Sequence, residues 1–254
     1  MKILLTGATG YIGKRILPDL VNNGHHVVCC VRDKSRFNPP KSIKSSISII
    51  QIDLLDASSL SNIPTDIDAA YYLVHSMAVS ANYKNLEEQS AINFRNAINC
   101  TKAKQVIYLS CIVNESNLSK HLLSRKTVED ELDKGKYALT CLRAGIIVGS
   151  GSASFEIMRD LVEKLPIMIT PKWLLTKCQP IGISDVQIFL TKCLLNEKTF
   201  NRNFDIGSND VLSYKEMLLV FAKVRNLKRF IITVPLLTPR LSSYWLYFVT
   251  STSY

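Results

Sequence analysis

Three glycines follow the first apolar stretch of the chain at a fixed spacing. Lys2–Leu5 is typical of a short buried strand, and the next residues, 6–13, are TGATGYIG. A strand, a glycine-rich turn and a helix start open the βαβ unit that binds a dinucleotide. The first glycine permits a sharp turn, the second lets the backbone approach a pyrophosphate, and the third lets the helix pack closely. The motif predicts a phosphate site at the helix N-terminus, where N–H groups are free, formed by Gly7, Thr9, Gly10, Tyr11, Ile12 and Gly13.

Length and composition fit one large α/β domain. The chain has 254 residues, of which 47% are hydrophobic, enough for a full core. Its formal charge of +10 is spread without any basic block longer than two residues, so nucleic acid is not expected as a partner. A phosphate-bearing cofactor, a membrane surface or a missing acidic segment would each balance that charge.

The cysteines and the N-terminus indicate a reducing compartment. The seven cysteines are an odd number with no CxxC pair, and several lie in apolar runs. We therefore expect buried thiols rather than disulfides, and no metal site. The chain enters its first strand at once, and no apolar run approaches the ~20 residues that span a bilayer. These features predict a soluble, cytoplasmic protein.

Strand-like and helical segments alternate over the first 150 residues. Apolar runs typical of buried strands lie at 26–31, 48–52, 68–74, 105–109 and 138–144, and helical patterns lie at 81–103 and 119–134. Strand, helix and strand in regular succession predict an α/β fold with a Rossmann-type, doubly wound parallel sheet.

The pattern changes after Gly149. Helices are expected at 155–165, 184–196 and 213–224, with short strands at 178–183 and 204–206. These segments are too small for an independent domain and suit a small C-terminal α/β lobe on the substrate side of the sheet. The predicted organisation is an NAD(P)-binding core at 1–150, a lobe integrated with the core at 151–234, and an apolar C-terminal segment at 235–254.

Together these motifs resemble the extended or atypical branch of the short-chain dehydrogenase/reductase superfamily. The TGxxGxxG loop is typical of that branch, as are Asp53-Leu54, Gln179–Ile181 and Phe204–Gly207. Four further stretches resemble a bacterial group of NmrA-like NAD(P)-binding proteins that often carry a C-terminal module of the DUF2867 type: residues 72–77, 121–125, 149–159 and 235–247. The resemblance implies the fold and the cofactor class and leaves the substrate open.

The end of the second strand favours NADP(H) over NAD(H). By the resemblance, an acidic residue there would bind the ribose hydroxyls of NAD, but this chain has Arg32, with Arg36 close behind. A carboxylate would repel a 2′-phosphate, whereas a guanidinium can bind it through two hydrogen bonds. The alternatives are that Asp33 binds the ribose, or that Arg32 is a solvated surface charge.

Two further strand ends carry expected site residues. By the resemblance, Asp53 would accept a hydrogen bond from the adenine amino group, and Leu54 would offer its backbone. The alternative for Asp53 is an aspartate that begins a turn. His75 and Ser76 follow the fourth strand at the edge where such sheets bind ligands, and His75 is a tentative acid–base residue. The alternative for His75 is a buried histidine that bonds to the backbone.

The proton-transfer pair that the resemblance implies is missing. In the superfamily, Tyr-x-x-x-Lys lies on the helix after the fifth strand, and a serine ends that strand. Ser110 is present, but none of the ten tyrosines has a lysine four residues later. His121 and Arg125 take the equivalent place on one helix face and are the tentative catalytic residues with Ser110. Imidazole suits acid–base work, but the fixed charge of Arg125 disfavours imidazolium, and Arg125 itself would hold ribose or phosphate oxygens. The alternative for His121 is a partly exposed residue of an amphipathic helix.

These residues leave two functions open. One is an NADP(H)-dependent oxidoreductase that moves a hydride to a small or lipid-like carbonyl or quinone. The other is a cofactor-binding redox sensor or assembly factor without turnover, for which NmrA-like regulators and an accessory subunit of respiratory complex I are precedents. The missing tyrosine disfavours a sugar-nucleotide epimerase. The aromatic stretch 241–249 would dock on this domain, contact a membrane surface or lead into a further module, and the resemblance favours the last.

Overall fold

The structure is a computed structural model that describes residues 1–74, 83–113 and 120–234. The chain forms two compact units. The first consists of Met1–Ala144 with Gln187–Asp205, and the second consists of Gly145–Val186 with the chain from Ile206 onward. The segment 187–205, which the sequence analysis assigned to the lobe, belongs to the first unit.

The first unit is built on a seven-stranded sheet with the order β11-β6-β5-β4-β1-β2-β3. This order contains the 3-2-1-4-5-6 arrangement of a doubly wound sheet, with β11 added beside β6. The predicted Rossmann-type architecture is therefore confirmed. The strands are β1 (Lys2–Leu5), β2 (His26–Val31), β3 (Ile47–Gln51), β4 (Ala69–Tyr72), β5 (Gln105–Cys111), β6 (Ala138–Ala144) and β11 (Arg202–Ile206).

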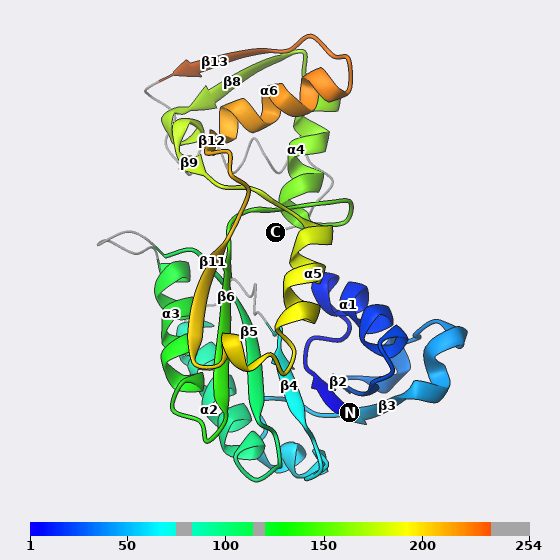
Figure 1. The fold of residues 1–254 in the computed structure, drawn as a ribbon. Coiled ribbons are helices and arrows are strands. Elements are labelled where there is room, and N and C mark those ends of the chain that lie inside the picture. The colour runs from blue at the N-terminus through cyan, green and yellow to red at the C-terminus, as the bar shows by residue number, and fades with distance from the viewer. Residues whose placement is uncertain (75–82, 114–119, 235–254) are drawn as a thin grey trace. The chain divides into compact units, whose positions relative to one another are not determined.

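Helices cover both faces of this sheet. Figure 1 shows α2 and α3 on one face and α1 on the other. An aromatic cluster fills the core on the α2 side: the ring of Tyr72 lies 4.9 Å from that of Phe94 and 5.8 Å from that of Tyr108, both edge to face. The helices of this unit are α1 (Tyr11–Asn22), α2 (Tyr83–Ile98) and α3 (Lys120–Leu132), with short 3₁₀ turns at Lys34–Arg36, Lys41–Ser46, Ala57–Asn62 and Glu197–Thr199.

The buried amide of Gln105 explains why the segment 187–205 belongs to the first unit. Its Nε2 donates to the carbonyl of Cys193 at 3.0 Å, and its Oε1 accepts from the backbone N–H of Leu195 at 2.5 Å. The hydroxyl of Tyr71 donates to the carbonyl of Leu190 at 2.9 Å. Strands β4 and β5 thus hold the C-terminal half of helix α5 (Ile183–Cys193) through buried polar groups that need these partners.

The second unit packs two helices around a core of its own. Helix α4 (Ala153–Lys164) meets α6 (Tyr214–Val224), and the rings of Phe155 and Phe221 lie 5.4 Å apart, edge to face. Ser213 begins α6 with a capping box completed by Glu216. The short strands pair as β10–β7, β12–β9 and β13–β8. Their bounds are β7 (Ile147–Val148), β8 (Ile167–Pro171), β9 (Lys177–Cys178), β10 (Ile181–Gly182), β12 (Leu212–Ser213) and β13 (Phe230–Val234), with a 3₁₀ turn at Lys172–Leu175.

Among the described residues, no helix is both long and apolar enough to cross a bilayer.

Candidate dinucleotide-binding site

The glycine loop has a backbone that only small residues allow. Gly7 has a φ of +71°, and a Cβ at this position would lie 2.6 Å from the carbonyl oxygen of Leu73. Gly10 donates its N–H to the carbonyl of Gly7 at 2.8 Å, and a Cβ on Gly13 would collide with that same carbonyl. The loop is thus folded tightly on itself between β1 and α1, as the spacing predicts.

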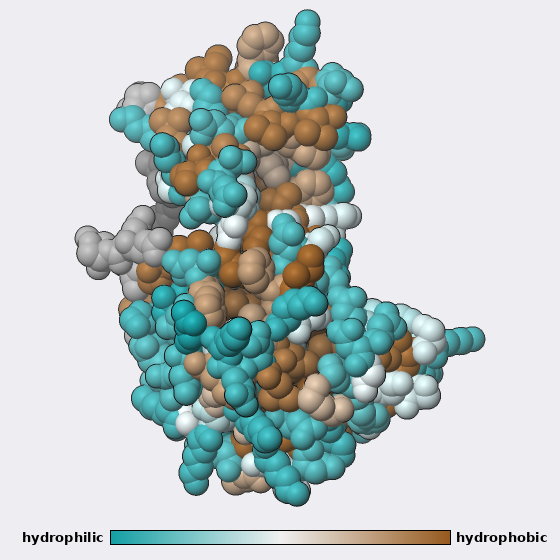
Figure 2. Space-filling model, in the orientation of Figure 1, coloured by the Kyte–Doolittle hydropathy of each residue, from teal (hydrophilic) through white to brown (hydrophobic). Residues whose placement is uncertain are grey.

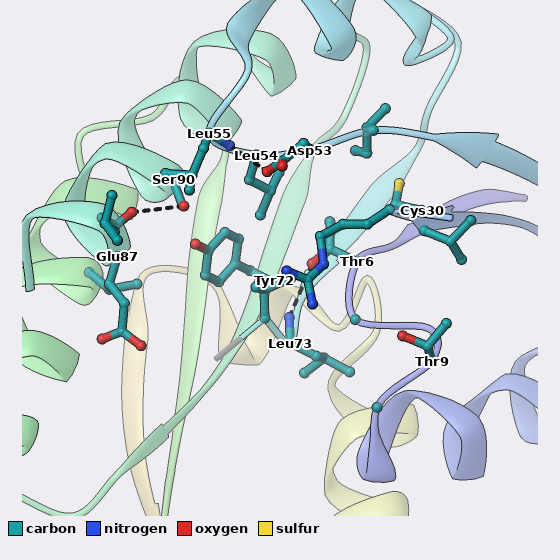
Figure 3. A pocket seen from close by; sticks show the side chains of 18 of the residues that line it. Thr6, Thr9, Cys30, Asp53, Leu54, Leu55, Tyr72, Leu73, Glu87 and Ser90 are labelled. Atoms are coloured by element: carbon teal, nitrogen blue, oxygen red, sulfur yellow. Dashed lines mark hydrogen bonds between the residues drawn. The ribbon is translucent and has the colours of Figure 1, made fainter. Parts of the chain in front are cut away.

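Thr6 fixes this loop to the neighbouring strand. Its buried hydroxyl donates to the carbonyl of Tyr71 at 2.9 Å and accepts from the N–H of Leu73 at 3.2 Å. Figure 3 shows the second of these bonds at the centre of the site. Because β1 and β4 are where the strand order reverses, the loop is anchored at the topological switch point, where ligands of doubly wound sheets bind.

No side chain of the described residues caps or neutralises the positive N-terminus of α1. Gly10 caps the helix without a side-chain hydrogen bond, and the first turn contains no acidic residue. The first N–H groups of α1 and the positive end of its dipole are therefore available to an anion. A phosphate at this position needs no further cation from the helix itself.

A cavity of about 550 Å³ extends from this loop across the carboxyl ends of the strands. Figure 3 shows Thr9 on one side and Ser90 and Glu87 of α2 on the other, with Tyr72 between them. The cavity is large enough for a cofactor-sized ligand. Its lining is Thr6, Gly7, Thr9, Gly10, Cys30, Val31, Arg32, Ile52, Asp53, Leu54, Leu55, Tyr72, Leu73, Val74, Leu86, Glu87, Ser90, Arg125 and Val128.

Arg32 and Asp33 have separate roles at the end of β2. Arg32 is exposed and lines the cavity. Asp33 instead caps the 3₁₀ turn that follows, because its Oδ1 accepts from the N–H and the hydroxyl of Ser35 at 2.9 and 2.7 Å. These bonds hold the pKa of Asp33 below its usual value. Arg36 is exposed and is not part of the lining. Of Arg32, Asp33 and Arg36, only Arg32 lines the cavity, so the end of β2 presents a guanidinium to it and no carboxylate.

Asp53 begins a turn and also lines the cavity. Its Oδ1 accepts from the N–H of Leu55 at 3.0 Å, which makes it the first residue of a turn. It also lines the cavity, together with the buried side chain of Leu54. Asn93 of α2 donates to the carbonyl of Leu54 at 2.8 Å and so fixes this corner of the site.

Arg125 brings a positive charge to the lining of the cavity. It lies on α3 and lines the cavity, and its Nε is buried without a hydrogen-bond partner among the described residues. Burial raises the pKa of Tyr108 to about 12, and the nearby charge of Arg125 opposes that rise. His121 lies four residues earlier on the same helix, as expected, but its side chain is outside what the structure describes.

Ser110 is not among the residues that line the cavity. It is buried in β5, and its Oγ has no hydrogen-bond partner of good geometry among the described residues. Two other expected site residues, His75 and Ser76, lie outside the described residues. Tyr11, Ile12 and Gly13 belong to α1 and are not part of the lining, so of the predicted loop residues Gly7, Thr9 and Gly10 face the cavity.

Glu87 is a site residue that the sequence analysis missed. It lies on α2, is buried, and accepts a short hydrogen bond from the hydroxyl of Ser124 on α3. Ala91 and Phe94, at helical spacing from Glu87, are fully buried. A carboxylate that begins an otherwise apolar helix face was the available signal, because such a charge is buried only with partners.

No group of three or more possible metal-ligating side chains occurs within the described part of the chain.

The part of the chain that forms most of the cavity matches a known protein family. Residues 3–111 match the NAD dependent epimerase/dehydratase family. This stretch contains the glycine loop, Arg32, Asp53 and Ser110, and it ends before α3.

Known proteins are similar to this chain at low sequence identity. The chloroplastic divinyl chlorophyllide a 8-vinyl-reductase of Zea mays is 21% identical over 221 residues, which are 81% of this chain and 54% of that protein. This chain therefore spans about half the length of that relative. A Staphylococcus aureus nucleoside-diphosphate-sugar epimerase superimposes with a TM-score of 0.79 at 16% identity, covering 96% of this chain and 84% of its own. A Bacillus cereus UDP-glucuronic acid 4-epimerase in complex with NAD superimposes with a TM-score of 0.71 at 19% identity, covering 92% of this chain and 88% of its own.

Proposed function

We propose that the cavity binds NADP(H) and that the protein is an oxidoreductase. The observation that carries the proposal is the rim of the cavity after β2, where Arg32 faces the cavity while Asp33 caps a turn. A guanidinium there supports a 2′-phosphate, which a carboxylate would repel. The tight glycine loop and the uncapped N-terminus of α1 fit the pyrophosphate of the same cofactor.

The missing proton-transfer pair argues against an epimerase, and a reductase with this cavity would need other residues to move the proton. When bound, a nicotinamide supplies or accepts a hydride. The chain has no Tyr-x-x-x-Lys pair to move the proton. The guanidinium of Arg125 can stabilise negative charge on a substrate oxygen, but a guanidinium does not serve as a proton donor in turnover. His121 is the acid–base candidate on the same helix, with Ser110 as a neighbouring hydroxyl and His75 as a second candidate.

The substrate class follows from that division of roles. We propose an acceptor whose reduction builds negative charge on an oxygen, such as a small or lipid-like carbonyl or a quinone. The maize relative is named a vinyl-reductase, which adds a conjugated alkene to the acceptors worth testing.

A second candidate function rests on the missing tyrosine. A protein that keeps the cofactor cavity without the usual proton donor would serve as a redox sensor or assembly factor, as the NmrA-like resemblance suggests. It would bind NADPH with no consumption across the whole acceptor panel.

We expect Arg32→Ala to weaken NADPH binding about 10- to 100-fold and to leave NADH binding almost unchanged. Charge-assisted hydrogen bonds of this kind contribute about 1.5–3 kcal/mol, and NADH lacks the phosphate that would receive them. Isothermal titration calorimetry of both cofactors on the wild type and the variant measures the effect.

Lys41→Ala is the matched control for this measurement. Lys41 is exposed in the same unit and lies outside the cavity lining, so its loss removes one positive charge but no contact. An equal loss of NADPH affinity in both variants would mean that Arg32 contributes only through the overall charge of the protein and not through a contact. Tighter binding of NADH than NADPH by the wild type would overturn the proposed cofactor.

Arg125→Ala should lower kcat/KM for NADPH-dependent reduction about 100-fold, the usual cost of losing a donor that stabilises a developing charge. Arg125→Lys should recover much of the rate, because it restores a cation at the same helix position. Absorbance at the nicotinamide band follows turnover with each acceptor. If Arg125→Ala turned over as fast as the wild type, Arg125 would have no part in the reaction.

A further inference from the structure

The strands β8 and β13 form a two-stranded sheet with an apolar outer face. They pair in parallel, and the register sets Ile167 opposite Phe230 and Ile169 opposite Ile232. These four side chains are 59%, 66%, 55% and 54% exposed. Since side chains alternate along a strand, all four project from the same face. We call them the β8–β13 face.

The opposite side of this sheet is an ordinary core face. Met168 is fully buried, and Ile231, its partner in the register, packs against the core of the second unit. Figure 1 shows α6 lying along this pair of strands. One apolar face of the sheet is therefore packed against the core, and the described residues leave the other face uncovered. Figure 2 shows apolar side chains reaching the surface over the part of the second unit that carries these strands.

Basic residues flank the β8–β13 face at both ends. Lys228 is exposed two residues before β13, and Lys172 is exposed directly after β8. The acidic residues of α4, which precedes β8, are already paired: Asp160 lies 3.0 Å from Lys164, and Glu163 lies 3.1 Å from Arg225. The uncompensated charge around the apolar face is thus positive, in a chain whose formal charge is +10.

We propose that the β8–β13 face docks on an anionic lipid surface. Apolar side chains that enter the interface, with lysines beside them that reach the headgroups, match the chemistry of peripheral membrane binding. A second copy of the chain fits less well. Because both ends of the face carry a lysine, pairing it with itself sets like charges against each other. This inference is independent of the proposed cofactor and reaction.

The test is co-sedimentation of the full chain with vesicles of phosphatidylcholine, alone or mixed with phosphatidylserine. We expect binding only to the mixed vesicles, lost at about 0.5 M salt because screening weakens surface electrostatics. Lys172→Ala with Lys228→Ala should weaken binding about 25-fold, since each cation near an anionic surface contributes about fivefold. Lys41→Ala with Lys44→Ala removes the same charge from exposed sites of the first unit and should have a much smaller effect.

The apolar contribution has a matched control of its own. Ile232→Asp should abolish sedimentation with mixed vesicles, whereas Ile188→Asp should not, although both isoleucines are 54% exposed. Circular dichroism of each variant confirms that it is folded. Equal loss in both isoleucine variants, or no binding of the wild type to mixed vesicles, would overturn the proposal. A wild-type dimer that Ile232→Asp splits, without vesicle binding, would assign the face to a second copy instead.

Discussion

Gly7→Ala should destabilise the protein by about 3 kcal/mol or more and remove measurable NADPH binding. The variant has two separate costs. A φ of +71° strains any residue with a Cβ, and that Cβ would lie 2.6 Å from the carbonyl oxygen of Leu73. Left-handed backbone alone costs about 1–2 kcal/mol, so the collision with backbone, which the neighbouring strand holds in place, accounts for the rest. Urea unfolding and calorimetry measure the two effects.

Gly24→Ala separates strain from collision. Gly24 has a similar φ of +80°, but no atom lies within 4 Å of the position that its Cβ would take. The same substitution there should cost only about 1 kcal/mol and leave cofactor binding intact. Equal destabilisation in the two variants would mean that the contact with Leu73 contributes nothing and that the loop is held only by backbone preference.

The alternation of apolar strands with helical segments was enough to predict strands β1 to β6 of the first unit. The run predicted at 138–144 is the whole of β6, and the strand predicted at 26–31 is the whole of β2. Strands buried on both faces consist of continuous apolar residues, so their limits are visible in the sequence. The glycine loop was predictable for a similar reason, since a phosphate-binding turn needs its small residues at fixed positions.

The second unit was harder to predict because its strands lack that signal. β8 and β13 are far apart in the sequence, and each exposes apolar side chains on its outer face, so neither has the polar alternation of a half-buried strand. Their pairing depends on contacts in space that no local pattern records. The segment 187–205 illustrates the same limit, because the buried amide of Gln105 decides to which unit it belongs.

The residues of the candidate site also differ in how well the sequence predicts them. Arg32 and Asp53, which line the cavity, lie within two residues of the ends of strands that the sequence locates. For Glu87 the sequence offers only the indirect signal of a carboxylate on an apolar helix face, because its partner Ser124 lies on a different helix. Sequence spacing also does not show that Asp33 caps a 3₁₀ turn instead of binding a ribose. That choice depends on the position of Ser35, whose N–H and hydroxyl donate to Asp33.

Glu129→Ala should destabilise the first unit by about 3–5 kcal/mol. Glu129 is buried on α3 and forms an ion pair with Arg143 at the end of β6, which also donates its Nε at 3.2 Å. Asn203 of β11 donates to the same carboxylate at 3.1 Å. The carboxylate raises the pKa of Arg143 above its usual value. Its removal would leave the guanidinium partly buried and unpaired, which is the costly way to break such a pair.

Asp130→Ala tests whether burial is the reason. Asp130 is the next residue of α3 and pairs with Lys126 at 3.1 Å, but both side chains are about half exposed. Exposed pairs one helical turn apart contribute about 0.3–0.5 kcal/mol, so this variant should unfold almost like the wild type in urea. Glu129→Gln should fall between the two, because it keeps hydrogen-bonding atoms but loses the charge. If Glu129→Ala were as stable as Asp130→Ala, the junction of α3, β6 and β11 would depend on apolar packing alone.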